Sequence, residues 1–243
     1  MSLDFFSMRL LLSLFLLTTF VTVTVCYVIA YVNGDIHYGH CMVSAAIGVD
    51  PGRVIGSFGV SLSSSLLAVI FVGRYLMSSI TNNLVAEPLK DYMFVKLLSP
   101  LGLCLSLFGC LGMIGVGAVS VIKAKTVHGW VMVITFISLL SGICAFSLEE
   151  LLLRKIWLAS RRLIFLRVFL AISSVLMTLA MFWAILFGEA AIGRDNKGFL
   201  SALFENIVLL LICLYIATFY NDFGKVKFTF LASLKSNNNW HTL

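Results

Sequence analysis

Six long apolar runs constrain the fold of this chain more than any other feature. Each run is about 20 residues long, and an α-helix that rises 1.5 Å per residue needs about 20 apolar residues to cross the hydrocarbon core of a bilayer. We therefore expect an all-α, polytopic membrane protein built as a bundle of six transmembrane helices. The expected spans are residues 10–32, 54–73, 101–122, 129–148, 168–187 and 199–220.

Composition agrees with a membrane protein and argues against other classes. Of the 243 residues, 60% are hydrophobic and only 12% are charged, with a mean hydropathy of +1.05. A soluble domain of this length would not carry so much apolar surface. The net charge of +6 comes from basic residues that lie almost wholly between the apolar runs, so nucleic acid is not expected as a partner. No segment between the runs is much longer than 20 residues, which predicts one domain over 1–243.

Two of the expected helices begin with a recognisable pair of residues. Asp50-Pro51 precedes the second run and Ser99-Pro100 precedes the third. Asp and Ser are favoured N-cap residues, and proline is favoured in the first helical turn. The first run is longer than the apolar core of a secretory signal and has no small-residue cleavage site. It is therefore interpreted as a retained span.

The distribution of Lys and Arg predicts the orientation of the bundle. Twelve of the seventeen basic residues lie in the two terminal segments, the 74–96 loop and the 149–167 loop, and five lie in the other three loops. Because basic residues concentrate on the cytosolic side, both termini are expected to be cytosolic. Segments 33–53, 123–128 and 188–198 would then face the lumen or exterior.

Small residues recur at helical spacing in the third run. Gly102, Ser106 and Cys110 are four residues apart, and Gly109, Gly112 and Gly115 are three apart. Small side chains at these spacings let two helix backbones approach closely. We interpret them as a helix packing surface.

Glu205 is the candidate site residue that stands out most clearly. It lies about two turns inside the last apolar run, where an unsatisfied carboxylate costs on the order of 2.5 kcal/mol or more. It should therefore face other helices or a wet cavity. His128 begins the fourth run and, as a tentative catalytic partner of Glu205, would act as acid or base on an ester or position a lipid head group. The alternative is an interhelical hydrogen bond for Glu205 and an interfacial place for His128.

Basic residues suggest two further sites. Those expected on the lumenal side would bind a lipid head group: His40, Arg53, Lys123 and Lys125. Those in the fourth loop would lie on the anionic cytosolic leaflet, unless the ordinary positive-inside bias alone explains them: Arg154, Lys155, Arg161 and Arg162.

The sequence predicts no metal and no cofactor. His37, His40 and Cys41 lie close together in the first loop, but zinc requires three or four ligands in tetrahedral geometry. Solvated loop residues are the simpler interpretation. No G-x-S-x-G, H-E-x-x-H or glycine-rich phosphate loop is present.

Three segments of the chain resemble the post-GPI-attachment-to-proteins factor 2 family. The first is His40-Cys41 followed by the string 43–48 and Pro51; the second is His128. The third is the last helix, with Phe204-Glu205 and the ending FYNDFGK at 219–225. The layout of six spans is similar throughout. The wider superfamily also contains DRAM-type autophagy modulators.

This resemblance implies a function in lipid remodelling of glycosylphosphatidylinositol (GPI) anchors. Members of that family act in the Golgi at the reacylation stage, when the lyso form regains a saturated chain. The expected partners are GPI-anchored proteins or a lyso-GPI lipid, together with membrane lipids. The resemblance leaves open whether the protein is an acyltransferase or an accessory factor. The alternative is a non-enzymatic DRAM-type adaptor that regulates autophagy or phosphoinositide signalling from a lysosomal or plasma membrane.

Overall fold

The computed structural model describes residues 7–35, 42–84, 93–119, 124–153, 159–192 and 194–224, and in these ranges the secondary structure is helical. Six of the helices are long and apolar enough to cross a membrane, which confirms the six-span helical architecture. In chain order the helices are α1 Met8–Val32, α2 Val43–Ala46, α3 Gly52–Leu84, α4 Met93–Ala118, α5 Lys125–Leu152, α6 Arg161–Ile192, α7 Arg194–Ala217 and α8 Tyr220–Phe223.

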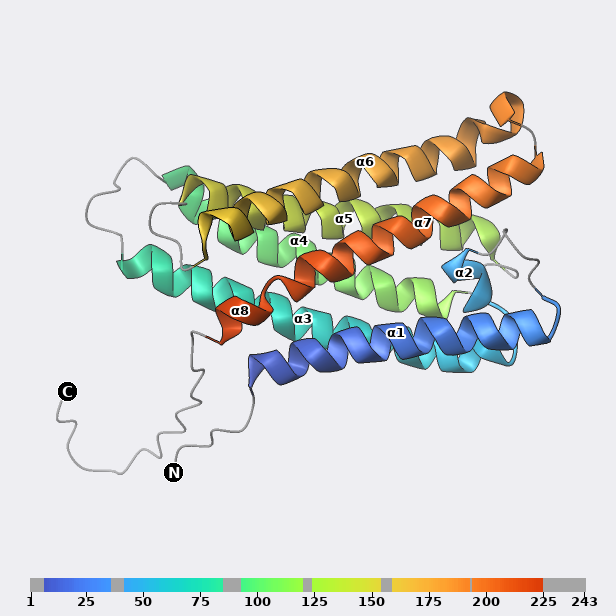
Figure 1. The fold of residues 1–243 in the computed structure, drawn as a ribbon, viewed down its shortest axis with the longest axis horizontal. Helices are drawn as coiled ribbons and strands as arrows, with labels where there is room; N and C mark the ends of the chain where they lie inside the picture. The colour runs from blue at the N-terminus through green and yellow to red at the C-terminus, as the bar shows by residue number, and fades with distance from the viewer. Residues whose placement is uncertain are drawn as a thin grey trace.

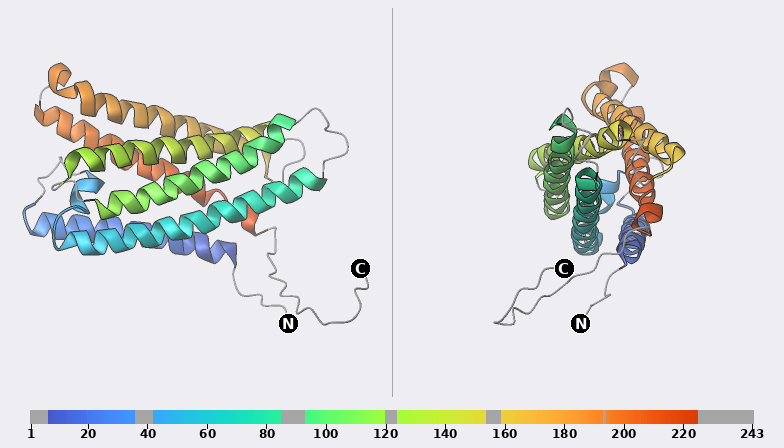
Figure 2. Two further views of the ribbon diagram at one scale, coloured as in Figure 1. Left: turned by 180° about the vertical axis from the view of Figure 1, so that it is seen from behind. Right: turned by 90° about the vertical axis from the view of Figure 1, so that its left-hand side faces the viewer.

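The long helices run back and forth along one common direction, so the bundle has two distinct ends (Figures 1 and 2). The beginning of α1 and the short helix α8 lie together at one end, where Arg9 Nε donates a hydrogen bond of 3.0 Å to the carbonyl of Tyr220. We call this the terminal end. The short helix α2 lies at the other, which we call the α2 end. Which end faces the cytosol stays a prediction from the charge distribution.

Several expected helix boundaries are wrong: α3 continues to Leu84 where the expected span ends at 73, and α6 covers Arg161–Ile192 where 168–187 was expected. The proline that was expected to begin the third span, Pro100, lies inside α4, which begins at Met93. Proline removes one backbone donor, but membrane helices tolerate this where neighbouring groups satisfy the freed carbonyl. The fourth span does not end at 148, because α5 continues through Glu149 and Glu150. The other pair lies close to the expected boundary, but Pro51 precedes the helix, since α3 begins at Gly52.

The small residues of α4 do form a close seam with α5. A Cβ atom added to Gly109 would come within 2.9 Å of the Leu139 backbone. The seam is reciprocal, because α5 contributes a glycine of its own: a Cβ on Gly142 would lie 2.9 Å from both the Gly102 carbonyl oxygen and the Ser106 nitrogen. These distances are too short for a side-chain carbon, so the approach of α4 and α5 depends on glycine.

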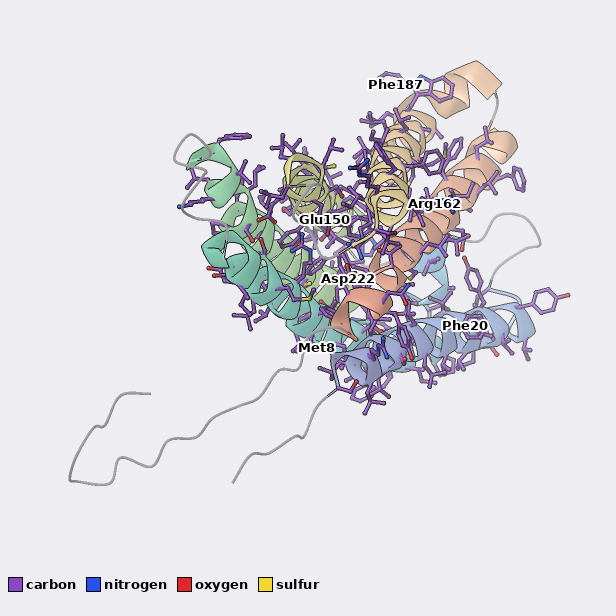
Figure 3. All side chains as sticks on the ribbon, turned by 60° about the vertical axis from the view of Figure 1, so that its left-hand side comes forward. Met8, Phe20, Glu150, Arg162, Phe187 and Asp222 are labelled. Carbon is purple, nitrogen blue, oxygen red and sulfur yellow. The ribbon has the colours of Figure 1, made fainter. Side chains whose placement is uncertain are left out.

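A cluster of buried charges joins four helices at the terminal end. We call it the ionic cluster; its members are Arg74 of α3, Glu149 and Glu150 of α5, Arg167 of α6 and Asp222 of α8. Their side chains are at most 3% exposed. Figure 3 labels Glu150 and Asp222 among the helices at the end of the bundle turned toward the viewer.

Glu150 is the centre of this cluster. Its Oε1 accepts hydrogen bonds from Arg74 Nε at 3.1 Å and from Arg167 Nη1 at 2.9 Å. Arg167 also donates from Nη2 to Asp222 at 2.6 Å and to the Thr218 carbonyl at 2.9 Å. Glu149 accepts from Ser78 and lies 3.5 Å from Arg74. Helices α3, α5, α6 and α8 are therefore held in one register by charged groups that must stay paired.

We expect Gly142→Ala to destabilise the bundle, because the added methyl group must push α4 away from α5. Overpacking of this kind costs about 1–3 kcal/mol, and thermal unfolding of the purified protein in nanodiscs measures it. Gly129→Ala is the matched control on the same helix, since nothing lies within 4 Å of a Cβ at that position. Equal unfolding temperatures for the two variants would contradict the close seam.

We expect Glu150→Gln to lower the free energy of unfolding by about 3–5 kcal/mol, the usual cost of removing one partner from a buried ion pair. Two buried guanidinium groups would then lose their shared carboxylate. The same thermal unfolding assay measures the change, with Asp35→Asn as the control because Asp35 is exposed. The central role of Glu150 is refuted if both carboxylate-to-amide changes have the same small effect.

Candidate functional site

A cavity of about 130 Å³ lies inside the bundle toward the α2 end, and we call it the interior cavity. Residues from α1, α2, α3, α4, α5 and α7 line it. Most of these side chains are apolar, among them Phe15, Leu67, Phe136 and Leu209. The cavity is therefore a mainly hydrophobic space whose few polar groups decide what it can recognise.

Glu205 is the charged residue in the lining of this cavity. It lies near the middle of α7 and is only 4% exposed. Its Oε1 accepts a hydrogen bond of 3.3 Å from the backbone N–H of Ser44 in α2. The carboxylate of Glu205 thus faces other helices and a cavity, as expected from the high free-energy cost of a carboxylate in lipid. The short helix α2 lies over this carboxylate at the α2 end.

Three polar atoms in the cavity lining have no hydrogen-bond partner among the described residues. They are Glu205 Oε2, Thr19 Oγ1 and Ser63 Oγ, and they come from α7, α1 and α3. Buried polar groups are nearly always satisfied, and each exception calls for a water, a ligand or a function. The interior cavity therefore offers one carboxylate oxygen and two hydroxyl groups to an occupant that is otherwise apolar.

His128 does not join Glu205 in this cavity. It is buried in the first turns of α5, and its Nδ1 lies 2.7 Å from the Val119 carbonyl. Because a carbonyl only accepts, Nδ1 carries the proton in this hydrogen bond. Nε2 is buried and unpartnered among the described residues, and His128 lines neither cavity found there. The observed contact ties the segment before α5 to that helix.

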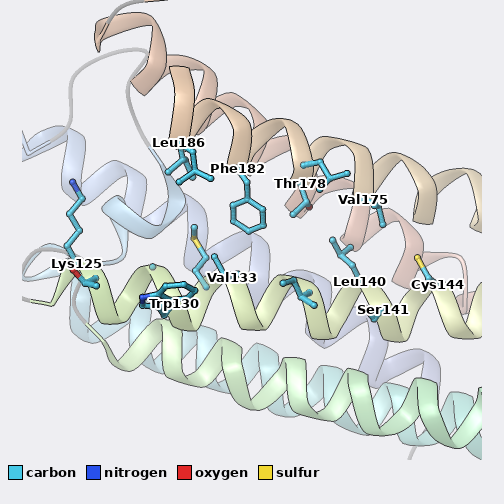
Figure 4. Close-up of a pocket in the computed structure, with 16 residues that line it drawn as sticks. Lys125, Trp130, Val133, Leu140, Ser141, Cys144, Val175, Thr178, Phe182 and Leu186 are labelled. Atoms are coloured by element: carbon cyan, nitrogen blue, oxygen red, sulfur yellow. The ribbon is translucent and has the colours of Figure 1, made fainter. Parts of the chain in front are cut away.

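Of the four expected head-group residues, the two that the structure describes do not line the cavity of Glu205. Arg53 lies half-buried at the beginning of α3 and lines neither cavity. Lys125 is exposed and lines a second cavity of about 810 Å³ between α5 and α6, which we call the outer groove (Figure 4). His40 and Lys123 lie outside the described residues.

The basic residues expected at the cytosolic leaflet are partly described. Arg161 and Arg162 begin α6 at the terminal end, and both are exposed. Figure 3 labels Arg162 on the yellow beginning of α6. Arg154 and Lys155 lie outside the described residues. The two visible arginines are free to reach a membrane surface, and their role there stays a prediction.

Sequence reasoning missed several parts of the site. It placed neither Thr19 nor Ser63 in a site. It also placed 43–48 in a loop, whereas Val43–Ala46 forms α2 and brings Ser44 to Glu205. No local signal marks these contacts, because they join segments distant in the sequence. Among the described residues, no group of three or more His, Cys, Asp or Glu side chains is placed to hold a metal ion.

Comparison with known proteins gives one match. The family described as Frag1/DRAM/Sfk1/Cwh43P N-terminal domain matches residues 7–226, which include all eight helices. No curated protein and no solved structure gives a significant match. Since the family match covers most of the chain, the protein belongs to the Frag1/DRAM/Sfk1/Cwh43P N-terminal domain family.

Proposed function

We propose that this protein takes part in lipid remodelling of GPI anchors, at the stage when a lyso-lipid regains a fatty acyl chain, in the Golgi membrane. The observation that carries the proposal is the interior cavity, where a buried carboxylate oxygen without a partner lies in an apolar lining. A GPI-anchored protein or a lyso-GPI lipid would be the substrate.

The chemistry of the cavity suits a lyso-lipid. Such a lipid has an apolar chain and, next to it, the free hydroxyl group that acylation modifies. The cavity provides an apolar lining together with Glu205 Oε2, which accepts a hydrogen bond. Its volume of about 130 Å³ is below the roughly 300–1,000 Å³ of pockets that hold a whole drug-sized ligand. It therefore receives the hydroxyl-bearing part of the lipid and not the whole molecule.

Glu205 has a role in either form of this function. As an accessory group it orients the lyso hydroxyl by accepting its hydrogen bond, and as a general base it would also remove the proton. The hydrogen bond from Ser44 occupies Oε1 and leaves Oε2 for the lipid. The resemblance of the Phe204-Glu205 helix and its FYNDFGK ending to the post-GPI-attachment-to-proteins factor 2 family supports this assignment.

We expect Glu205→Gln to abolish most of the activity while the protein still folds. The amide oxygen can keep the bond from Ser44, but the amide NH2 group then replaces Oε2, and this group donates and cannot accept the hydrogen bond of the lyso hydroxyl. Hydrogen bonds to charged groups contribute about 1.5–3 kcal/mol, so the loss should be about tenfold or more. The assay is rescue of cells that lack their own GPI-remodelling factor, read as surface and shed GPI-anchored reporter.

The control for this rescue is Leu210→Ala, which changes an exposed residue of the same helix. The native chain and Leu210→Ala should restore the surface reporter, and Glu205→Gln should not, at equal protein levels. Full rescue by Glu205→Gln would remove Glu205 from the site. Failure of the native chain, when well expressed in the Golgi, would refute the GPI assignment itself.

The exposure of Arg161 and Arg162 favours a second candidate function, a non-enzymatic DRAM-type adaptor. In that case the basic beginning of α6 would bind anionic lipid head groups at the cytosolic leaflet. The double variant Arg161→Gln, Arg162→Gln should then weaken the autophagy or phosphoinositide response that the protein regulates. Glu205→Gln should leave that response unchanged. A normal autophagy or phosphoinositide readout in the double variant would count against the adaptor.

A further inference from the structure

The residues that line the outer groove recur at regular spacing along two helices, α5 and α6. The α5 residues include Trp130, Val133, Ile137 and Ser141, and the α6 residues include Val175, Thr178, Phe182 and Leu186. These spacings of three and four place the side chains on one face of each helix. Figure 4 shows the two faces opposite each other across the groove, with Lys125 at one end.

The groove is long and narrow. From Lys125 to Cys144 it follows nineteen residues of α5, roughly 28 Å at 1.5 Å per residue, which is close to the thickness of a hydrocarbon core. Its volume is about 810 Å³. A helix of that length and 10 Å diameter would occupy roughly 2,200 Å³. The groove could enclose only part of another transmembrane helix, and its length and volume suit an extended hydrocarbon chain.

Among the described residues, Lys125 is the charged side chain that lines the groove. Lys125 is exposed and is the first residue of α5, whose N-cap Ala124 provides no side-chain hydrogen bond. The first N–H groups of a helix lack intrahelical partners, and this end of the helix dipole attracts anions. A cationic side chain and a helix N-terminus without a side-chain cap thus lie together at one end of an apolar groove.

Further along, the described part of the chain leaves a buried polar group of the groove without a partner. Thr178 is 4% exposed and lines it, yet Thr178 Oγ1 has no hydrogen-bond partner among the described residues. Met132 lines both the groove and the interior cavity. On the same wall Phe136 contacts Phe182 edge to face, with ring centroids 6.5 Å apart. Only side chains of α5 and α6 separate the two spaces.

We propose that the outer groove is a binding site for an anionic glycerophospholipid of the surrounding bilayer. Its phosphate-bearing head group lies at Lys125 and the N-terminus of α5, and one acyl chain lies between α5 and α6. This site is separate from the interior cavity, and its occupation does not depend on GPI chemistry.

The test uses the full chain in phosphatidylcholine nanodiscs with a trace of photoactivatable lipid. Two probes carry the same diazirine-labelled acyl chain, one with a phosphatidylserine head group and one with phosphatidylcholine. Labelled peptides should come mainly from residues 125–144 and 175–186. The phosphatidylserine probe should label them about fivefold more strongly, the effect of one basic side chain near a membrane surface.

Variants test the binding of the head group and the binding of the acyl chain separately. Lys125→Gln should remove the preference for phosphatidylserine, whereas Arg53→Gln should keep it, because Arg53 is at the same end but outside the groove. Ser141→Trp should block labelling by both probes. Leu210→Trp, on the exposed side of α7, should not.

Three outcomes would overturn the proposal. They are equal labelling of all lipid-facing helices, an undiminished phosphatidylserine preference in Lys125→Gln, and crosslinking of the groove to a second protein helix in place of lipid. Each is read on purified protein, so a failed GPI rescue in cells leaves the result of this test unchanged.

Discussion

The pairing of Arg74 and Arg167 with one buried carboxylate, Glu150, is the interaction on which the rest of the bundle depends. Inside a membrane protein, a charged group without a partner is expensive, so these side chains restrict how α3, α5 and α6 can be placed. Asp222 extends the restriction to α8. The terminal end is consequently a point where four helices must meet in one arrangement, and the remaining packing starts from it.

The two ends of the bundle hold their buried polar groups in different surroundings. At the terminal end Arg167 is bonded to Glu150, Thr218 and Asp222. Toward the α2 end, polar atoms of Glu205, Thr19 and Ser63 line a cavity without partners among the described residues. Local violations of polar satisfaction are expected at functional sites, where the rest of the fold compensates for them. The polar atoms that line a cavity, and are not packed into an ion-pair cluster, are the reason to propose a function on the α2 side.

The same asymmetry explains the position of the outer groove. Helices α5 and α6 are joined at the terminal end by Glu150 and Arg167, and they diverge toward Lys125 (Figures 2 and 4). The opposite side of α5 packs closely on α4 through Gly142 and Gly109. One side of helix α5 therefore packs closely on α4 through glycine contacts, and another side borders the outer groove. Met132 borders both spaces, and its unbranched, flexible side chain suits a position between them.

The sequence by itself determined the six spans, the glycine seam of α4 and the inward direction of Glu205, because apolar length, small-residue spacing and the cost of a carboxylate in lipid are local properties. It did not reveal that Glu149 and Glu150 belong to a helix, since a charge counts locally as a loop signal. Only the tertiary structure decided that: Arg74 lies 76 residues from Glu150, and Arg167 lies 55 from Asp222. The contact of Ser44 with Glu205 likewise depends on how the helices pack, and so does the position of His128 and Lys125 away from that cavity. Packing brings together residues that are distant in the sequence, and no local pattern marks them.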